Sequence, residues 1–166
     1  MVATTLVSVE EYLDSVYRPD VDFINGELLE RNVGELSHGT VQLNVASWLK
    51  GRSGLWRTKV VVEVRVRISE RRYRIPDVMV LSLDAPREEI VEAAPLLCIE
   101  ILSRRDSLNQ IWDRTQDYLA MGVPVCWIID PLVLRAWTVT SAGLVEVKDG
   151  ILRAGKIEMP LAEVSE

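Results

Sequence analysis

The sequence predicts a mixed α/β fold, an α+β arrangement in which a mixed β-sheet is flanked by helices. Two observations predict it: a strand-rich stretch at residues 59–81, and two apolar runs, residues 96–102 and 125–130, joined by an amphipathic helix at residues 106–121. Because a helix links two buried strands, we expect these strands to be parallel. With 166 residues, 48% of them hydrophobic, the chain is predicted to form one domain, residues 1–166, with a sizeable core.

The first fifty residues are expected to form a short helix, a β-hairpin and a longer helix. Ser8 begins a capping-box sequence, SVEE, which predicts a helix that ends before Pro19. In VDFINGELLER, two strand-like runs flank an Asn-Gly dipeptide, which supplies the positive φ angles of a tight turn. Ser37 is expected to cap a second helix, which stops at Gly51. These elements add an N-terminal hairpin to the mixed sheet.

The rest of the chain is predicted to be mainly strands. Residues 59–68 alternate between apolar and polar side chains, which is typical of a half-buried strand. A polar turn leads into RYRIPDVMVL, residues 72–81, which we expect to pair with it as an antiparallel strand. Pro76 and Asp77 interrupt this second strand, although proline is mostly confined to sheet edges, bulges and strand starts. After the strand–helix–strand unit, LRAWTVT and LVEVKDGILRA are expected to form a C-terminal β-meander.

Charge and apolar patterning exclude some classes of protein. The net charge of -6 argues against a protein that coats nucleic acid through its overall charge. No apolar run approaches the about 18 residues that span a bilayer, and the start lacks a basic stretch leading into an apolar one. We therefore expect a cytoplasmic protein with no membrane partner. Cys98 and Cys126 lie in apolar runs without metal-ligand spacing, so both are expected to be reduced core residues.

A run of arginines precedes Asp77. Its members form either a solvated hairpin face or a set of phosphate contacts, and the sequence leaves both interpretations open. They are Arg65, Arg67, Arg71, Arg72 and Arg74.

Asp77 and Glu100 are carboxylates within apolar strands, where a charge is costly unless it is paired. If their strands pair directly, they lie about 4.8 Å apart and the two side chains can converge on one point. Repulsion would then raise the pKa of one acid unless a cation sits between them. Mg²⁺ or Mn²⁺ suits such oxygen ligands, and the backbone carbonyl of Ile101 could complete the protein's share. The alternative for each acid alone is a carboxylate satisfied by protein groups.

The helix after Glu100 offers a cation that could reach this acid pair. Glu100 lies about 7 Å before the end of its strand, and Arg114 lies about 12 Å into a helix that returns along that strand. A long side chain can bridge the difference between these two levels. Gln110, one turn earlier on the same helix face, lies closer to the level of Glu100. The alternative is that Arg114 pairs with Asp113 or Asp117 at the surface.

Several motifs resemble, in this order and spacing, the bacterial putative restriction endonuclease-like family of the PD-(D/E)XK nuclease superfamily. They are IPD, IEILS, Arg114-x-x-x-Tyr118 and GVPVCWIIDP, and the similarity extends from DFINGELLE to about Thr140. The resemblance implies a restriction-endonuclease-like core in which Asp77 and Glu100 bind Mg²⁺ for phosphodiester hydrolysis of DNA. His38 matches a histidine that family members carry at the start of the first core helix, and the alternative is a surface histidine without a role in the site. Glu27 also matches the family pattern, but it is interpreted as a structural residue.

The chain departs from the family pattern at two positions. Family members usually carry lysine in place of Arg114 and aspartate in place of Gln110. Arginine keeps the positive charge but does not readily release a proton, and its donor geometry differs from that of an ammonium group. Three hypotheses follow. The first is a Mg²⁺- or Mn²⁺-dependent DNA endonuclease, expected to be a homodimer, whose site contains Asp77, Glu100, Arg114, Gln110 and His38. The second is an inactive nucleic-acid-binding or assembly module, and the third is a structural domain.

Overall fold

The structure is a computed structural model that describes residues 6–32 and 34–165. Its elements, in chain order, are α1 (Val9–Asp14), β1 (Val21–Ile24), β2 (Glu27–Glu30), α2 (Leu36–Gly51), α3 (Ser53–Trp56), β3 (Thr58–Val62), β4 (Val66–Ser69), β5 (Arg72–Arg74), β6 (Val78–Ser82), β7 (Leu97–Ile101), α4 (Leu108–Met121), β8 (Cys126–Asp130), β9 (Arg135–Thr140), β10 (Gly143–Glu146), β11 (Ile151–Ala154), β12 (Ile157–Pro160) and the 3-10 helix η1 (Leu161–Val164). Among these elements, no helix is long and apolar enough to cross a membrane.

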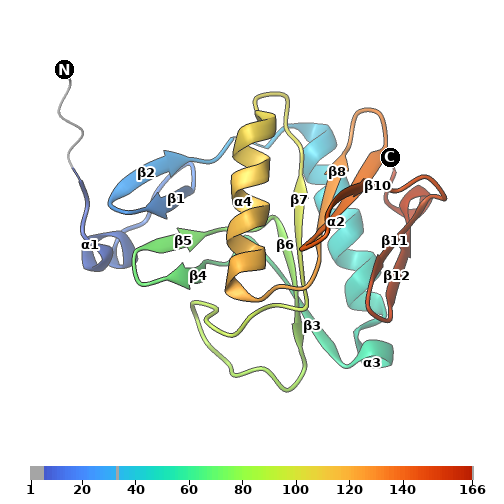
Figure 1. The fold of residues 1–166 in the computed structure, drawn as a ribbon, viewed down its shortest axis with the longest axis horizontal. Coiled ribbons are helices and arrows are strands. Elements are labelled where there is room, and N and C mark those ends of the chain that lie inside the picture. The colour runs from blue at the N-terminus through green and yellow to red at the C-terminus, as the bar shows by residue number, and fades with distance from the viewer. Residues whose placement is uncertain (1–5, 33, 166) are drawn as a thin grey trace.

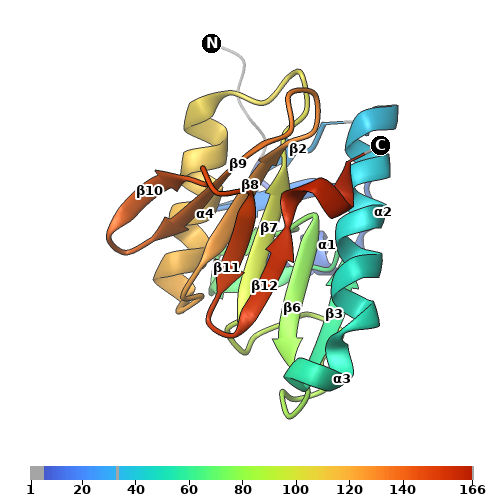
Figure 2. The same cartoon turned by 90° about the vertical axis from the view of Figure 1, so that its right-hand side faces the viewer.

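A six-stranded mixed sheet forms the centre of the molecule, in the order β10-β9-β8-β7-β6-β3. β7 and β8 run parallel, as the connecting helix predicts, and the other neighbours in this sheet are antiparallel. Helix α4 covers one face, while α2 and the β11–β12 hairpin cover the other (Figures 1 and 2). The predicted mixed sheet flanked by helices is confirmed. Cys98 and Cys126 are free and buried.

The long hairpin expected over residues 59–81 is divided between two sheets, so this prediction is wrong in detail. β3 pairs with β6 in the six-stranded sheet, whereas β4 pairs with β5 in a second sheet of order β2-β1-β5-β4. The first strand breaks at Glu63, whose φ of 51° lies in the left-handed region. The second breaks around Pro76, which has no N–H for a ladder hydrogen bond. Asp77 therefore directly precedes β6 at the junction of the two sheets.

Other boundaries also differ from the sequence predictions. Helix α2 begins at Leu36 rather than after a Ser37 cap, and its N-cap residue Glu35 makes no side-chain capping bond. The expected C-terminal meander is split, because β10 pairs with β9 while β11 pairs with β12 as a separate two-stranded sheet. The N-terminal hairpin forms as predicted, and β1 also pairs with β5. This pairing brings the end of β2 toward the central sheet.

Candidate active site

Asp77 and Glu100 come together at the junction of the two sheets. β6 and β7 are antiparallel with Val78 opposite Ile99, so one step along the same register places Asp77 opposite Glu100. Opposed residues of an antiparallel pair project their side chains to the same face. Both side chains are buried, and both accept from one guanidinium nitrogen. The sequence-based expectation of direct strand pairing is confirmed.

Arg31 donates that nitrogen. It follows β2, and its Nη2 lies 2.8 Å from Asp77 Oδ1 and 3.5 Å from Glu100 Oε2. A cation therefore does sit between the two acids, but it is a side chain that sequence reasoning missed. The only sequence signal was an arginine at the end of VDFINGELLER. Its relevance depends on the pairing of β1 with β5, which the local pattern did not reveal.

Asp77 is held as a carboxylate by donors from several elements. Its Oδ2 accepts from the Ile101 N–H at 2.7 Å and lies 3.4 Å from Nε2 of His38, a residue of the first turn of α2. Burial alone would raise the pKa of Asp77, yet the hydrogen bond from His38 and the charge of Arg31 outweigh it and lower the pKa. The same bond to Asp77 outweighs burial at His38 and raises the pKa of that imidazole.

Glu100 is completely buried and faces three donors. The Tyr118 hydroxyl donates to Oε1 at 2.5 Å, and Oε2 lies 3.3 Å from Arg114 Nη1 and 3.5 Å from Arg31. Burial raises the pKa of Glu100, and the charges of Arg31 and Arg114 only partly offset that effect. The two neighbouring acids thus have pKa values shifted in opposite directions.

Arg114 extends from α4 into the interior, with only 7% of its surface exposed. In addition to Glu100, its guanidinium lies 3.3 Å from Asp106 Oδ1 and 3.7 Å from Asp22 Oδ2. The alternative of a surface pair with Asp113 or Asp117 is therefore wrong. The reach estimated from strand and helix geometry is confirmed, whereas a catalytic role for Arg114 stays a prediction.

The arginines before Asp77 mostly serve the fold. Arg74 is buried and pairs with Asp22 at 2.9 Å and Asp117 at 2.7 Å, and Arg72 shares Asp117. Arg65 donates to backbone carbonyls at the end of α1 and just after it. The idea of one solvated hairpin face is thus wrong for these three, because the hairpin is split and its arginines turn toward neighbouring elements.

Gln110 does not join the acid pair in this structure. It is the third residue of α4, where its side chain accepts from the N–H and hydroxyl of the N-cap residue Ser107. This capping box holds the exposed side chain at the helix start, which explains why the helix-face argument placed it wrongly. Glu27 lies exposed on β2, an edge strand.

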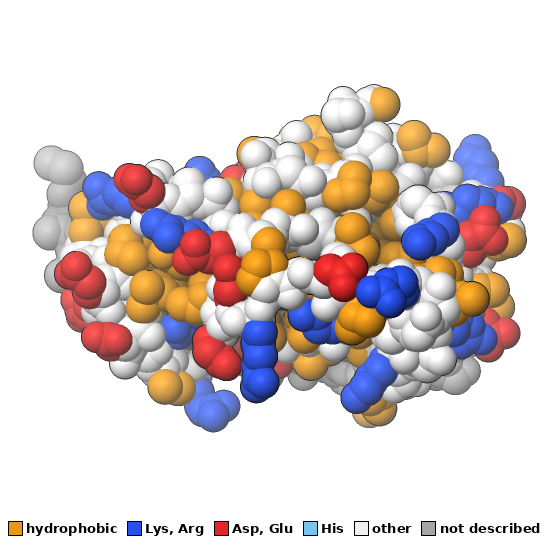
Figure 3. Space-filling model, turned by 90° about the horizontal axis from the view of Figure 1, so that it is seen from below, with side chains coloured by type: hydrophobic (Ala, Val, Ile, Leu, Met, Phe, Trp, Pro, Cys, Tyr) orange, Lys and Arg blue, Asp and Glu red, His pale blue; other side chains and the backbone are white. Residues whose placement is uncertain are grey.

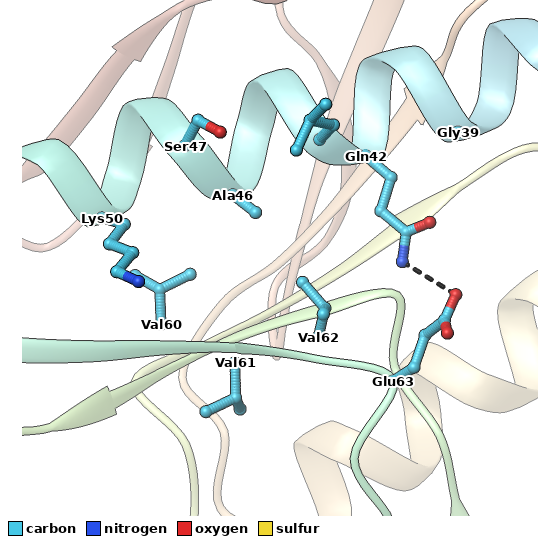
Figure 4. Close-up of a pocket in the computed structure, with 10 residues that line it drawn as sticks. Gly39, Gln42, Ala46, Ser47, Lys50, Val60, Val61, Val62 and Glu63 are labelled. Atoms are coloured by element: carbon cyan, nitrogen blue, oxygen red, sulfur yellow. Dashed lines mark hydrogen bonds between the residues drawn. The ribbon is translucent and has the colours of Figure 1, made fainter.

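Gln42 also contacts Asp77, and sequence reasoning missed it. Its Nε2 donates to the backbone carbonyl of Asp77 and to Oε1 of Glu63, both at 3.1 Å (Figure 4 shows the second bond). Glu63 N–H also donates to the Asp77 carbonyl at 3.3 Å. The signal was available, since Gln42 follows His38 by four residues on the predicted helix and thus shares its face.

A pocket of about 410 Å³ opens beside the acid pair. Arg31, His38 and Asp77 contribute to its wall, whereas the buried Glu100 does not. A second hollow of about 510 Å³ runs between α2 and β3 and shares Gln42 and Glu63 with the first (Figure 4). The site therefore adjoins a groove along the open edge of the six-stranded sheet.

The residues fit a divalent metal in chemistry but not in their present arrangement. Two carboxylates at one point are suitable ligands for Mg²⁺. However, no group of three or more Cys, His, Asp or Glu side chains within residues 6–32 and 34–165 is arranged to hold a metal. Every carboxylate oxygen of the pair faces a protein donor, which also meets the requirement of the structural alternative. Metal binding by both acids would require Arg31 to move.

A solved structure shares the fold of this protein. A crystal structure of a putative nuclease belonging to DUF820 from Anabaena variabilis ATCC 29413 matches with a TM-score of 0.82, covering 95% of this chain and 97% of that chain. The two sequences are 20% identical, so this similarity establishes the fold alone. The model of the Uma2 family, described as putative restriction endonuclease, matches residues 9–148, and the chain belongs to this family. No curated protein matches the sequence.

Proposed function

We propose that this protein is a nuclease that hydrolyses phosphodiester bonds of DNA with the help of Mg²⁺ or Mn²⁺. The observation that carries the proposal is the pairing of Asp77 and Glu100 across β6 and β7, beside a pocket with cationic side chains in its wall. Membership of the restriction endonuclease family supports the same reaction class. A family of this kind makes DNA the expected substrate.

Each residue of the site has a proposed role. Asp77, Glu100 and the Ile101 carbonyl would hold the ion, which when bound polarises a phosphate and lowers the pKa of a water. His38 is held toward the pocket by Asp77, and its raised pKa favours an imidazolium that can bind phosphate. Arg114 keeps Glu100 in place from the interior side. Gln110 lies outside this site and caps the start of α4.

Nicking of supercoiled plasmid in the presence of Mn²⁺ tests this function. Wild-type protein should convert plasmid to the open-circular form, and Asp77→Ala and Glu100→Ala should each abolish conversion. Asp84→Ala is the matched control, because Asp84 is an exposed acid two residues beyond β6 that pairs with the exposed Arg57. Equal nicking by all four proteins, or none by wild type, would refute the enzymatic proposal.

A second candidate function is an inactive DNA-binding or assembly module with the nuclease fold. It is favoured by the arginine at position 114 and by the protein donors that surround both acids. On this hypothesis the wild-type protein does not nick plasmid, because it carries Arg114 and Gln110 in place of the lysine and aspartate expected from the family resemblance. Arg114→Lys combined with Gln110→Asp should then create nicking activity. Continued inactivity with intact Mn²⁺ binding would contradict this explanation.

We also propose that residues 1–166 act as one domain and that two copies associate, since cleavage of both strands requires two sites. The edge strands β10 and β3 of the six-stranded sheet could mediate contact. Light scattering coupled to gel filtration measures the mass directly. A mass of one chain at all concentrations would exclude the dimer.

A further inference from the structure

The position between Asp77 and Glu100 is filled by a single nitrogen of Arg31. Nη2 donates to Asp77 at 2.8 Å, while its contact with Glu100 is long, at 3.5 Å. The side chain is 11% exposed, so water screens these charges only weakly. This guanidinium supplies positive charge where a divalent ion would have to lie to contact both carboxylates.

We propose that Arg31 is an exchangeable counter-ion, which neutralises the acid pair in the metal-free protein and leaves when a divalent cation binds both acids. This inference rests on the proposed function, because it concerns the same acid pair. It also explains why the two carboxylates can lie opposite one another in the interior without a metal. In this exchange one cation replaces another between the same carboxylate oxygens.

The geometry of Arg31 is that of a replaceable partner. A guanidinium binds most strongly when two nitrogens engage one carboxylate, yet only Nη2 hydrogen-bonds to the pair. Among residues 6–32 and 34–165, buried Nη1 has no hydrogen-bond partner, and Asp22 Oδ1 lies 3.8 Å from it. A buried donor left unsatisfied is unfavourable. The present position of Arg31 thus carries a cost that an alternative position can relieve.

The pocket provides such an alternative position. Arg31 forms part of its wall, so its side chain can rotate outward without passing through the core. Asp20 and Glu35 line the same pocket and offer carboxylates there, and a DNA phosphate would offer an anion of the same charge sign. Because Glu100 does not contribute to the pocket wall, an incoming ion reaches both acids only after Arg31 has moved.

Mn²⁺ binding measured by calorimetry without DNA tests this inference. Arg31→Met should bind Mn²⁺ about tenfold more tightly than wild type, or better, because a competing charge has been removed. Arg18→Met is the matched control, since Arg18 lines the same pocket but pairs with neither acid among the described residues. It should bind Mn²⁺ as wild type does. Arg31→Met combined with Asp77→Asn should lose the gain.

Folding of the variants is checked by circular dichroism, because unpaired buried acids destabilise a protein. If Arg31→Met does not fold, Arg31→Gln keeps an N–H donor for Asp77 without the charge, and it should show the same gain. A folded Arg31 variant that binds Mn²⁺ no more tightly than wild type overturns the counter-ion role. Tighter Mn²⁺ binding by Arg31→Met, together with no plasmid nicking by wild type, would instead refute the nuclease function alone.

Discussion

At the residue scale, the pKa values of the two acids of the candidate site shift in opposite directions. Asp77 has a lowered pKa because His38 and Arg31 overcome the effect of burial. Glu100 has a raised pKa because burial dominates. Opposite shifts in two neighbouring acids are a recurrent property of catalytic pairs, although buried ion-pair networks produce them too. Asp77 is thus the more firmly ionised member of the pair.

Tyr118→Phe tests whether the hydrogen bond from the Tyr118 hydroxyl to buried Glu100 stabilises the fold. The substitution removes the hydroxyl that donates to Oε1 at 2.5 Å and leaves a buried oxygen without that donor. The free energy of unfolding should fall by about 1–3 kcal/mol in urea denaturation. Tyr73→Phe, at another buried tyrosine, is the matched control and should cost less. Equal effects would contradict the role assigned to Tyr118.

Tyr12 makes stability depend on pH in the alkaline range. Burial raises the pKa of its hydroxyl from 10.0 to about 12, and the hydroxyl donates to the Val21 carbonyl. Because the folded state binds this proton more tightly, the stabilisation is complete below pH 10.0 and is lost as pH rises toward about 12. Urea denaturation of wild type and Tyr12→Phe at several pH values should show a steeper decline for wild type, and parallel declines would contradict this assignment.

The sequence identified the acid pair because carboxylates are conspicuous inside apolar strands, and it identified Arg114 because helix and strand rises are fixed. It missed Arg31 for a physical reason. The position of that side chain depends on which strands pair across the two sheets, and local periodicity carries no such information. Gln42 was within reach of the same reasoning, since it shares a helix face with His38.

At the element scale, the start of α4 sets the positions of Arg114 and Tyr118. Ser107 caps the helix, and its hydroxyl accepts from the Gln110 N–H. Ser107→Ala should lower the free energy of unfolding by about 0.5–2 kcal/mol. Ser47→Ala, at an exposed position within α2, should have little effect or be slightly stabilising. Chemical denaturation of both variants measures the difference, and equal stabilities would argue against the cap.

Most elements were predictable because their signals are local. The Asn-Gly turn, the amphipathic helix and the two apolar strands each have a characteristic pattern over a few residues. The division of residues 59–81 between two sheets was not predicted, because alternation continues through Glu63 in the sequence while its backbone turns left-handed. Alternation specifies which side chains share a face only when one strand continues unbroken.

At the scale of the whole molecule, charge does not mark a broad DNA-binding surface on the face shown in Figure 3. Acidic and basic side chains are interspersed there among apolar ones. The net charge is -6, so overall charge repels DNA. Affinity for DNA would therefore have to come from local groups, such as His38 and Arg31 in the pocket wall.

The C-terminal segment is expected to be essential for folding, although the family model ends at residue 148. β11, β12 and η1 bury Leu152, Met159 and Val164 against the core beneath α2. At about 1.5–3 kcal/mol for each buried side chain, these three contribute roughly as much as the stability of an ordinary domain. Removal of residues 149–166 should abolish cooperative thermal unfolding in calorimetry, and an unchanged transition would contradict this expectation.

The most direct test of the account is a crystal structure of the protein soaked in Mn²⁺, with the ion located by anomalous scattering. We predict one Mn²⁺ bound by the carboxylates of Asp77 and Glu100, with the guanidinium of Arg31 displaced into the pocket. A saturating soak that leaves Arg31 between the two acids and places no Mn²⁺ there would contradict both the proposed metal site and the exchange of counter-ions.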